Sequence, residues 1–134
     1  MYNSVCLVGQ VILIVEDEGG PFAQQLRAAL DWTGARTLLA RTPADARDYV
    51  ACFDLSATTV YSDGAIHSEE FPRLVKEMGG MPLLLYGTEP PPHQPFRNAR
   101  FLAASKPSHT GAIVEAVTRL LSSSAPAPAR LSTL

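Results

Sequence analysis

Acidic residues and one lysine follow three of the apolar segments in this sequence. They are Glu16-Asp17-Glu18 after the run 11–15, Asp63 after the run 57–62, and Lys106-Pro107 after the run 101–104. Clustered carboxylates repel one another unless a cation neutralises them, and Mg²⁺ prefers a couple of carboxylates, a carbonyl oxygen and several waters. A lysine beside the metal would hold an anionic group. Acids, metal and lysine together describe a site for phosphoryl transfer in which one carboxylate is the nucleophile.

Each of these groups, taken alone, is more typical of a structural role. A single Asp at the end of a strand commonly caps or turns the chain, a Lys-Pro dipeptide carries little information, and three acids in a row fit a solvated loop. The groups nevertheless follow three different predicted strands. Because sites in open parallel sheets form beyond the carboxyl ends of the strands, this joint placement favours a functional site.

Apolar segments alternate with segments of helical periodicity along the chain. Strands are predicted at 11–15, 37–40, 57–62, 82–86 and 101–104, and helices at about 22–34, 43–52, 68–78 and 108–121. Thr42 is the predicted N-cap of the second helix, with Pro43 in its first turn. This alternation predicts an α/β, flavodoxin-like (βα)5 fold, a doubly wound parallel sheet with strand order 2-1-3-4-5. Residues 89–95 contain four prolines, so the helix between the last two strands is expected to be degenerate or missing.

Composition restricts the class of protein. The chain has 134 residues, 46% of them hydrophobic and 18% charged, and this length and composition predict one folded domain. Its net charge of −2 argues against binding to nucleic acid or to an anionic membrane. No apolar run is long enough to span a bilayer, and a cytoplasmic protein is expected. Cys6 and Cys52 lie in apolar surroundings and are expected to be buried free thiols. Trp32 is expected to pack at the end of the first helix.

The predicted domain does not use the whole chain. Residues 1–10 are an N-terminal extension whose role stays open between a longer first strand, pairing with an edge strand, and a linker. Residues 11–121 form the domain. Residues 122–134, rich in Ser, Ala and Pro, are expected to be a disordered tail.

The sequence resembles the response-regulator receiver domain of two-component signalling, the CheY-like family. The resemblance covers residues 11 to about 121 and rests on Ile12-Leu13-Ile14-Val15-Glu16-Asp17-Glu18, Val60-Tyr61-Ser62-Asp63, Met81-Pro82-Leu83-Leu84-Leu85 and Ser105-Lys106-Pro107. It implies that Asp63 is the phosphoacceptor and that Lys106 contacts the phosphoryl group. It further implies a Mg²⁺ ion held by Glu16, Asp17, Asp63 and the backbone carbonyl of Ala65, and a cis peptide bond before Pro107.

The sequence departs from the family pattern at its switch. The strand-four position that normally carries Thr or Ser falls on Gly87, with Thr88 next to it, and the strand-five aromatic falls on Ala103. The proline-rich segment and Phe71-Pro72 resemble a receiver subgroup with a Phe-Ala-Thr-Gly-Gly/Tyr motif in strand four. These departures affect the residues expected to transmit the signal more than those expected to accept the phosphoryl group.

The resemblance implies a single-domain receiver in a phosphorelay. It would take a phosphoryl group from a phosphohistidine on a histidine kinase or histidine phosphotransfer protein, and then signal by contact with a downstream protein or act as a phosphate sink. It would be a phosphoacceptor rather than a turnover enzyme. Three alternatives stay open: a pseudo-receiver that works only as a protein-binding module, a receiver fragment of a hybrid histidine kinase, and, least supported, a small flavodoxin-like enzyme or nucleotide binder. A homodimer also stays open.

Overall fold

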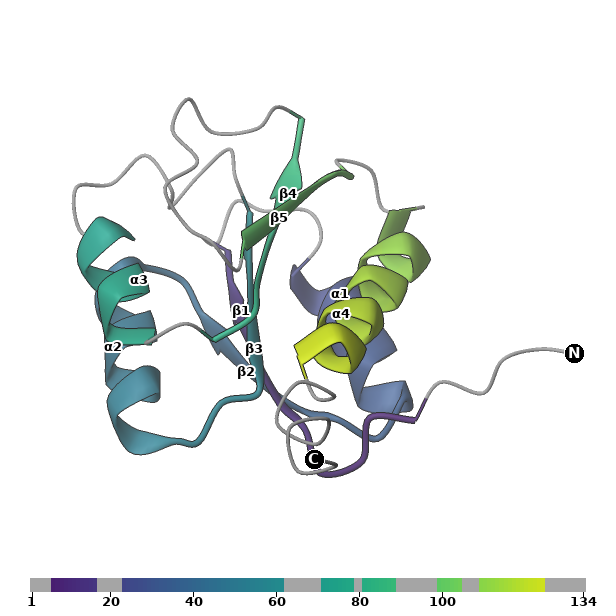
Figure 1. The fold of residues 1–134 in the computed structure, drawn as a ribbon, viewed down its shortest axis with the longest axis horizontal. Helices are drawn as coiled ribbons and strands as arrows, with labels where there is room; N and C mark the ends of the chain where they lie inside the picture. Colours follow the sequence, from purple (N-terminus) through teal and green to yellow (C-terminus); the bar gives the residue numbers. More distant parts are fainter. Residues whose placement is uncertain are drawn as a thin grey trace, which may run out of the picture.

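A five-stranded parallel sheet forms the centre of the molecule. The computed structural model describes residues 6–16, 23–61, 71–78, 81–88, 99–104 and 109–124. The strands are β1 (Val11–Val15), β2 (Arg36–Ala40), β3 (Ala57–Tyr61), β4 (Leu83–Gly87) and β5 (Ala99–Ala103). Their order is β2-β1-β3-β4-β5, and every neighbouring pair is parallel (Figure 1). The predicted flavodoxin-like topology is therefore confirmed, although β4 and β5 are shifted by one or two residues from the predicted ranges.

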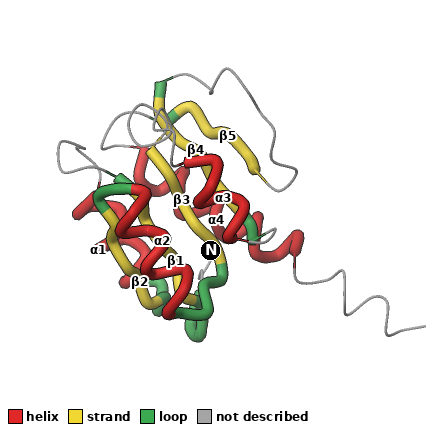
Figure 2. The backbone as a smooth tube through the Cα atoms, turned by 90° about the vertical axis from the view of Figure 1, so that its left-hand side faces the viewer, coloured by secondary structure: helices red, strands yellow, loops and turns green. Residues whose placement is uncertain are grey.

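Helices cover both faces of this sheet. They are α1 (Ala23–Trp32), α2 (Pro43–Cys52), α3 (Phe71–Met78) and α4 (Thr110–Ser124). Helices α1 and α4 lie on one face and α2 and α3 on the other (Figures 1 and 2). The helix predicted to be degenerate falls in the interval 89–98, outside the described residues. No helix in the described part of the chain is long and apolar enough to cross a membrane.

The alternation of side chains along β1 divides the core into two clusters. Ile12 and Ile14 pack toward α1 and α4, whereas Leu13 and Val15 pack toward α2 and α3, and all four are fully buried. A β-branched and apolar run without polar alternation suits a strand that is covered on both faces. This burial on both faces suits the interior position of β1, between β2 and β3.

Local signals set the bounds of α2 as predicted. The Thr42 hydroxyl accepts a hydrogen bond from the Asp45 N–H at 3.1 Å, and Pro43 occupies the first turn. On the outer surface, Arg47 of α2 forms an ion pair with Glu77 of α3, and its Nη2 lies 2.9 Å from Oε2 of Glu77. The hydrogen bond from this guanidinium holds the pKa of Glu77 below its usual range.

The described residues that precede β1 pack against the core. Leu7 is buried among the residues of the α1–α4 cluster, and its N–H donates to the Thr33 carbonyl at 2.9 Å. Gly34 has a φ of +97°, and a Cβ there would come within 2.5 Å of the Val8 side chain. The chain can turn this tightly only because Gly34 lacks a side chain. The packed domain therefore begins before Val11.

Three predictions about single residues are wrong. Cys6 and Cys52 are both exposed, and Trp32 is 91% exposed. Trp32 lies two positions after buried Leu30, a rotation of about 200° around the helix, which turns it away from the core. Helix α4 continues to Ser124, three residues beyond the end predicted for this helix at residue 121.

Candidate functional site

The carboxyl ends of the central strands meet at one edge of the sheet. Val15 of β1 pairs with Val60 of β3, and Tyr61 of β3 pairs with Tyr86 of β4. Glu16 is the next residue after β1, and Asp63 follows β3 after one intervening residue. The topology thus places the carboxyl ends of β1 and β3, which the predicted acidic residues follow in the sequence, side by side.

Glu16 directs its carboxylate into the molecule at this edge. Its side chain is fully buried, and its own N–H donates to the Ala40 carbonyl of β2 at 2.9 Å. Oε2 accepts a hydrogen bond from the N–H of Ala23, the first residue of α1, at 3.2 Å. Oε1 accepts one from the hydroxyl of Tyr86 at 2.5 Å. The carboxylate is therefore held by the start of α1 on one side and by β4 on the other.

Tyr86 is the site residue that the sequence analysis missed. It is fully buried, and its ring lies 5.6 Å from the Tyr61 ring between centroids. Burial, followed by the charge of Glu16, raises the pKa of Tyr86 far above its usual range, so the phenol keeps its proton and acts as a donor. A buried tyrosine needs a partner for its hydroxyl, and a Tyr after three leucines in a buried strand is the signal that could have identified it.

The degenerate switch positions lie beside one another in the sheet. Gly87 ends β4, is buried, pairs with Ala103 of β5, and accepts a hydrogen bond at its carbonyl from the Ala104 N–H at 3.1 Å. Thr88 is exposed. The two positions that the resemblance assigns to a switch hydroxyl and an aromatic ring are therefore neighbours, and neither side chain can supply these groups.

The remaining predicted site residues lie outside the described part of the structure. They are Asp17, Asp63, Ala65, Lys106 and Pro107. Their convergence on Glu16, their roles and the cis bond before Pro107 stay predictions. Among the described residues, no group of three His, Cys, Asp or Glu side chains is placed to hold a metal ion.

The chemistry of the donor set nevertheless fits Mg²⁺. Glu16, Asp17, Asp63 and a backbone carbonyl are hard oxygen ligands of the kind that this ion prefers. Glu16 shows a feature typical of carboxylates near metal sites, since both of its oxygens are oriented by hydrogen bonds from other groups.

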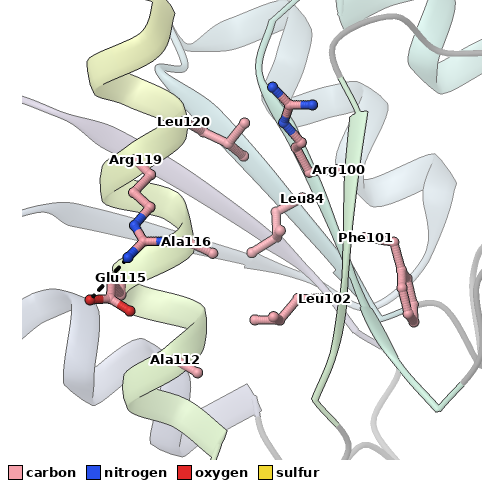
Figure 3. Close-up of a pocket in the computed structure, with 9 residues that line it drawn as sticks. All are labelled: Leu84, Arg100, Phe101, Leu102, Ala112, Glu115, Ala116, Arg119 and Leu120. Carbon is pink, nitrogen blue, oxygen red and sulfur yellow. Dashed lines mark ion pairs between the residues drawn. The ribbon is translucent and has the colours of Figure 1, made fainter.

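A separate groove lies between β5 and α4. Its volume is about 380 Å³, and Leu84, Leu102, Ala116 and Leu120 line it (Figure 3). On its α4 side, Arg119 Nη2 lies 3.7 Å from Glu115 Oε2. The groove contains none of the predicted site residues, so the chemistry proposed from the sequence does not belong to it.

Comparisons of sequence and of structure gave different results. No family model matches the chain, and no curated protein matches it in sequence. Solved structures do match. A response regulator receiver protein from Sinorhizobium medicae superposes with a TM-score of 0.64 at 17% identity, over 84% of this chain and 94% of that one.

Two further solved structures of receiver domains also superpose on this chain. A response regulator receiver domain protein from Bacillus halodurans matches with a TM-score of 0.62 at 17% identity, over 80% of this chain and 95% of that one. A Francisella response regulator receiver domain matches with a TM-score of 0.63 at 12% identity, over 85% and 98%. Together with the observed strand order, these matches show that the chain has the fold of response-regulator receiver domains.

Proposed function

We propose that this protein is a receiver that accepts a phosphoryl group on Asp63 in a Mg²⁺-dependent reaction. The donor would be a phosphohistidine on a histidine kinase or histidine phosphotransfer protein in the cytoplasm. The observation that carries the proposal is the buried Glu16 at the end of β1, in a sheet with receiver topology, beside the strand that leads to Asp63.

The proposed reaction moves one phosphoryl group. A carboxylate oxygen of Asp63 attacks phosphorus, a P–O bond forms, the P–N bond to the imidazole breaks, and the imidazole nitrogen leaves with the electron pair and takes up a proton. Hydrolysis of the resulting acyl phosphate by water later restores Asp63. Glu16, Asp17, Asp63 and the Ala65 carbonyl would hold Mg²⁺, which when bound neutralises charge on the carboxylates and the phosphoryl oxygens. Lys106 would contact the phosphoryl group.

Intact-mass measurement tests this proposal. Treatment with a small acyl phosphate donor and Mg²⁺ should add the mass of one phosphoryl group, and hydroxylamine should remove it because an aspartyl phosphate is an acyl phosphate. Asp63→Asn should abolish the gain, and Asp17→Ala should slow it and weaken Mg²⁺ binding. A wild-type protein that never gains the mass, or an Asp63→Asn variant that still does, contradicts the proposed mechanism.

A second candidate is a pseudo-receiver that works only by binding another protein. The register pair of Gly87 and Ala103 favours it, because neither residue offers the groups that normally convert phosphorylation into a change of surface. The same mass measurement separates the candidates, since a pseudo-receiver gains no phosphoryl group. In either case the output would be a contact with a downstream protein. A phosphate sink or a receiver fragment of a hybrid histidine kinase would share the phosphorylation chemistry.

A further inference from the structure

The groove between β5 and α4 lies on the face of the sheet that α1 and α4 cover. Helix α4 packs mainly against α1, β3 and β4, so it lies to one side of β5 (Figure 3). Side chains alternate along β5: Arg100 and Leu102 line the groove, whereas Phe101 packs into the core cluster of the other face. The space left between strand and helix has a volume of about 380 Å³, which is in the range of pockets that hold small molecules.

Apolar side chains form the inside of this groove. Leu84 of the interior strand β4 is 1% exposed and forms its floor. Leu102 of β5 and Ala116 of α4 line its sides and are only partly buried. None of these side chains offers a hydrogen-bond donor or acceptor. Because removing apolar surface from water is favourable, the groove is suited to an aliphatic chain.

The rim of the groove carries more positive than negative charge. Arg100 of β5 and Arg119 of α4 stand on opposite sides, and Glu115 is the single acidic residue in the lining (Figure 3). Glu115 forms an ion pair with Arg119, with 3.7 Å between Oε2 and Nη2. The exposed side chain of Arg100 has no hydrogen-bond or ion-pair partner in the described part of the structure. An unpaired guanidinium beside an apolar groove is complementary to a carboxylate, to which arginine can donate two parallel hydrogen bonds.

We propose that this groove binds a small soluble aliphatic carboxylate, whose chain lies on Leu84, Leu102 and Ala116 and whose carboxylate pairs with Arg100. Nine residues line the groove, whereas a stable protein interface takes about 20 to 30 residues on each side, so its size suits a small molecule. All nine lie in the described part of the structure, and none belongs to the acidic edge. The inference therefore does not depend on the proposed phosphoryl transfer.

The first test uses the wild-type protein with octanoate as the probe. Titration should shift the backbone amide NMR signals of Leu102 and Ala116 along one saturation curve, with a Kd of about 1 mM for so small a ligand. The amide of Val50, in α2 on the other face of the sheet, should stay constant. Octanol keeps the chain and lacks the charge, and butyrate keeps the charge and shortens the chain. Each should bind about 10-fold more weakly than octanoate.

Two pairs of variants locate the binding. Arg100→Gln should raise the Kd for octanoate about 10-fold, and Arg36→Gln, in the opposite edge strand β2, should leave it unchanged. Ala116→Leu fills the groove with a residue that favours helix and should raise the Kd at least about 10-fold. Ala28→Leu, at an exposed position of α1, is its matched control. Thermal unfolding followed by circular dichroism shows whether each variant keeps the fold.

Several outcomes would overturn the inference. Octanol that binds as tightly as octanoate would show that no carboxylate is recognised, and equal effects of Ala116→Leu and Ala28→Leu would show that the chain does not enter the groove. A sedimentation coefficient that falls in Ala116→Leu, with octanoate binding unchanged, would make the groove a contact between copies of this chain. Each of these results leaves the proposed function standing, because the mass measurement on Asp63 does not involve the groove.

Discussion

At the scale of single residues, some buried polar side chains have hydrogen-bond partners and one does not. Glu16 and Tyr86 bond to each other, and the Thr58 hydroxyl donates to the Met81 sulfur at 3.0 Å. The fully buried hydroxyl of Thr59 has no hydrogen-bond partner within the described part of the structure. A buried polar group that lacks a partner costs free energy, because water would have bonded to it in the unfolded chain.

We expect Thr59→Val to stabilise the protein. Valine keeps the β-branched shape between its register partners Ile14 and Leu84 and removes the unbonded hydroxyl. The free energy of unfolding, measured by urea titration, should rise by about 1 kcal/mol. Thr58→Val on the same strand is the control and should gain less, because it loses the bond to Met81. Equal effects of the two variants would contradict the explanation.

Tyr86 also shows why the site was only partly predictable at this scale. The acids and the lysine have distinctive residue types at strand ends, so the sequence could single them out. Tyr86 stands within an apolar strand, and its role depends on which face of the sheet its ring occupies and on the direction of the Glu16 carboxylate. Those orientations depend on packing between segments far apart in the chain.

At the scale of elements, local signals predicted where several helices and strands lie. Thr42-Pro43 marks the start of α2, and the apolar run 11–15 marks β1. The bounds of β4 and β5 were less accurate, because hydrogen bonding to a neighbouring strand decides where a strand ends. The exposure of Trp32 and Cys52 was missed since both end a helix, where adjacent apolar residues do not show which face is covered.

We expect Thr42→Ala to lower the free energy of unfolding by about 1 kcal/mol, because the N–H of Asp45 loses the acceptor that caps α2. Thr42→Ser keeps the hydroxyl and should retain most of the stability. Both can be compared by urea titration followed by circular dichroism. A Thr42→Ser variant as unstable as Thr42→Ala would show that the methyl group, and not the cap, is responsible.

At the scale of the whole molecule, the fold was predictable and the route of the signal was not. Strand order follows from alternating strands and helices with short connections, a pattern that few topologies satisfy. The resemblance assigns the switch to one pair of register neighbours, Gly87 and Ala103. Neither can change rotamer in a way that moves a hydroxyl or a ring, so the proposed phosphorylation would have to act on the backbone around them.

We therefore expect phosphorylation to change the hydrogen-exchange protection of residues 87–95 more than that of α4. A phosphoryl group on Asp63 would add negative charge next to the segment that follows β4 and would favour a different conformation of that segment. Gly87, which has no side chain, allows the backbone there to change conformation. Mass spectrometry with and without the phosphoryl group measures this, and Thr88→Ala should reduce the change. Protection that responds only in α4 would place the output elsewhere.

The position of Trp32 decides how this protein can be observed. It is the only tryptophan in the chain. It is the last residue of α1, whereas the first residue of that helix, Ala23, donates a hydrogen bond to Glu16. Trp32 therefore lies the length of this helix away from Glu16. An indole that is 91% exposed emits at the long wavelengths of a solvated ring and is open to soluble quenchers. Intrinsic fluorescence would thus remain nearly constant through metal binding and phosphorylation. It would respond instead to anything that covers the opposite end of the molecule, which makes Trp32 a native probe for partners that dock there.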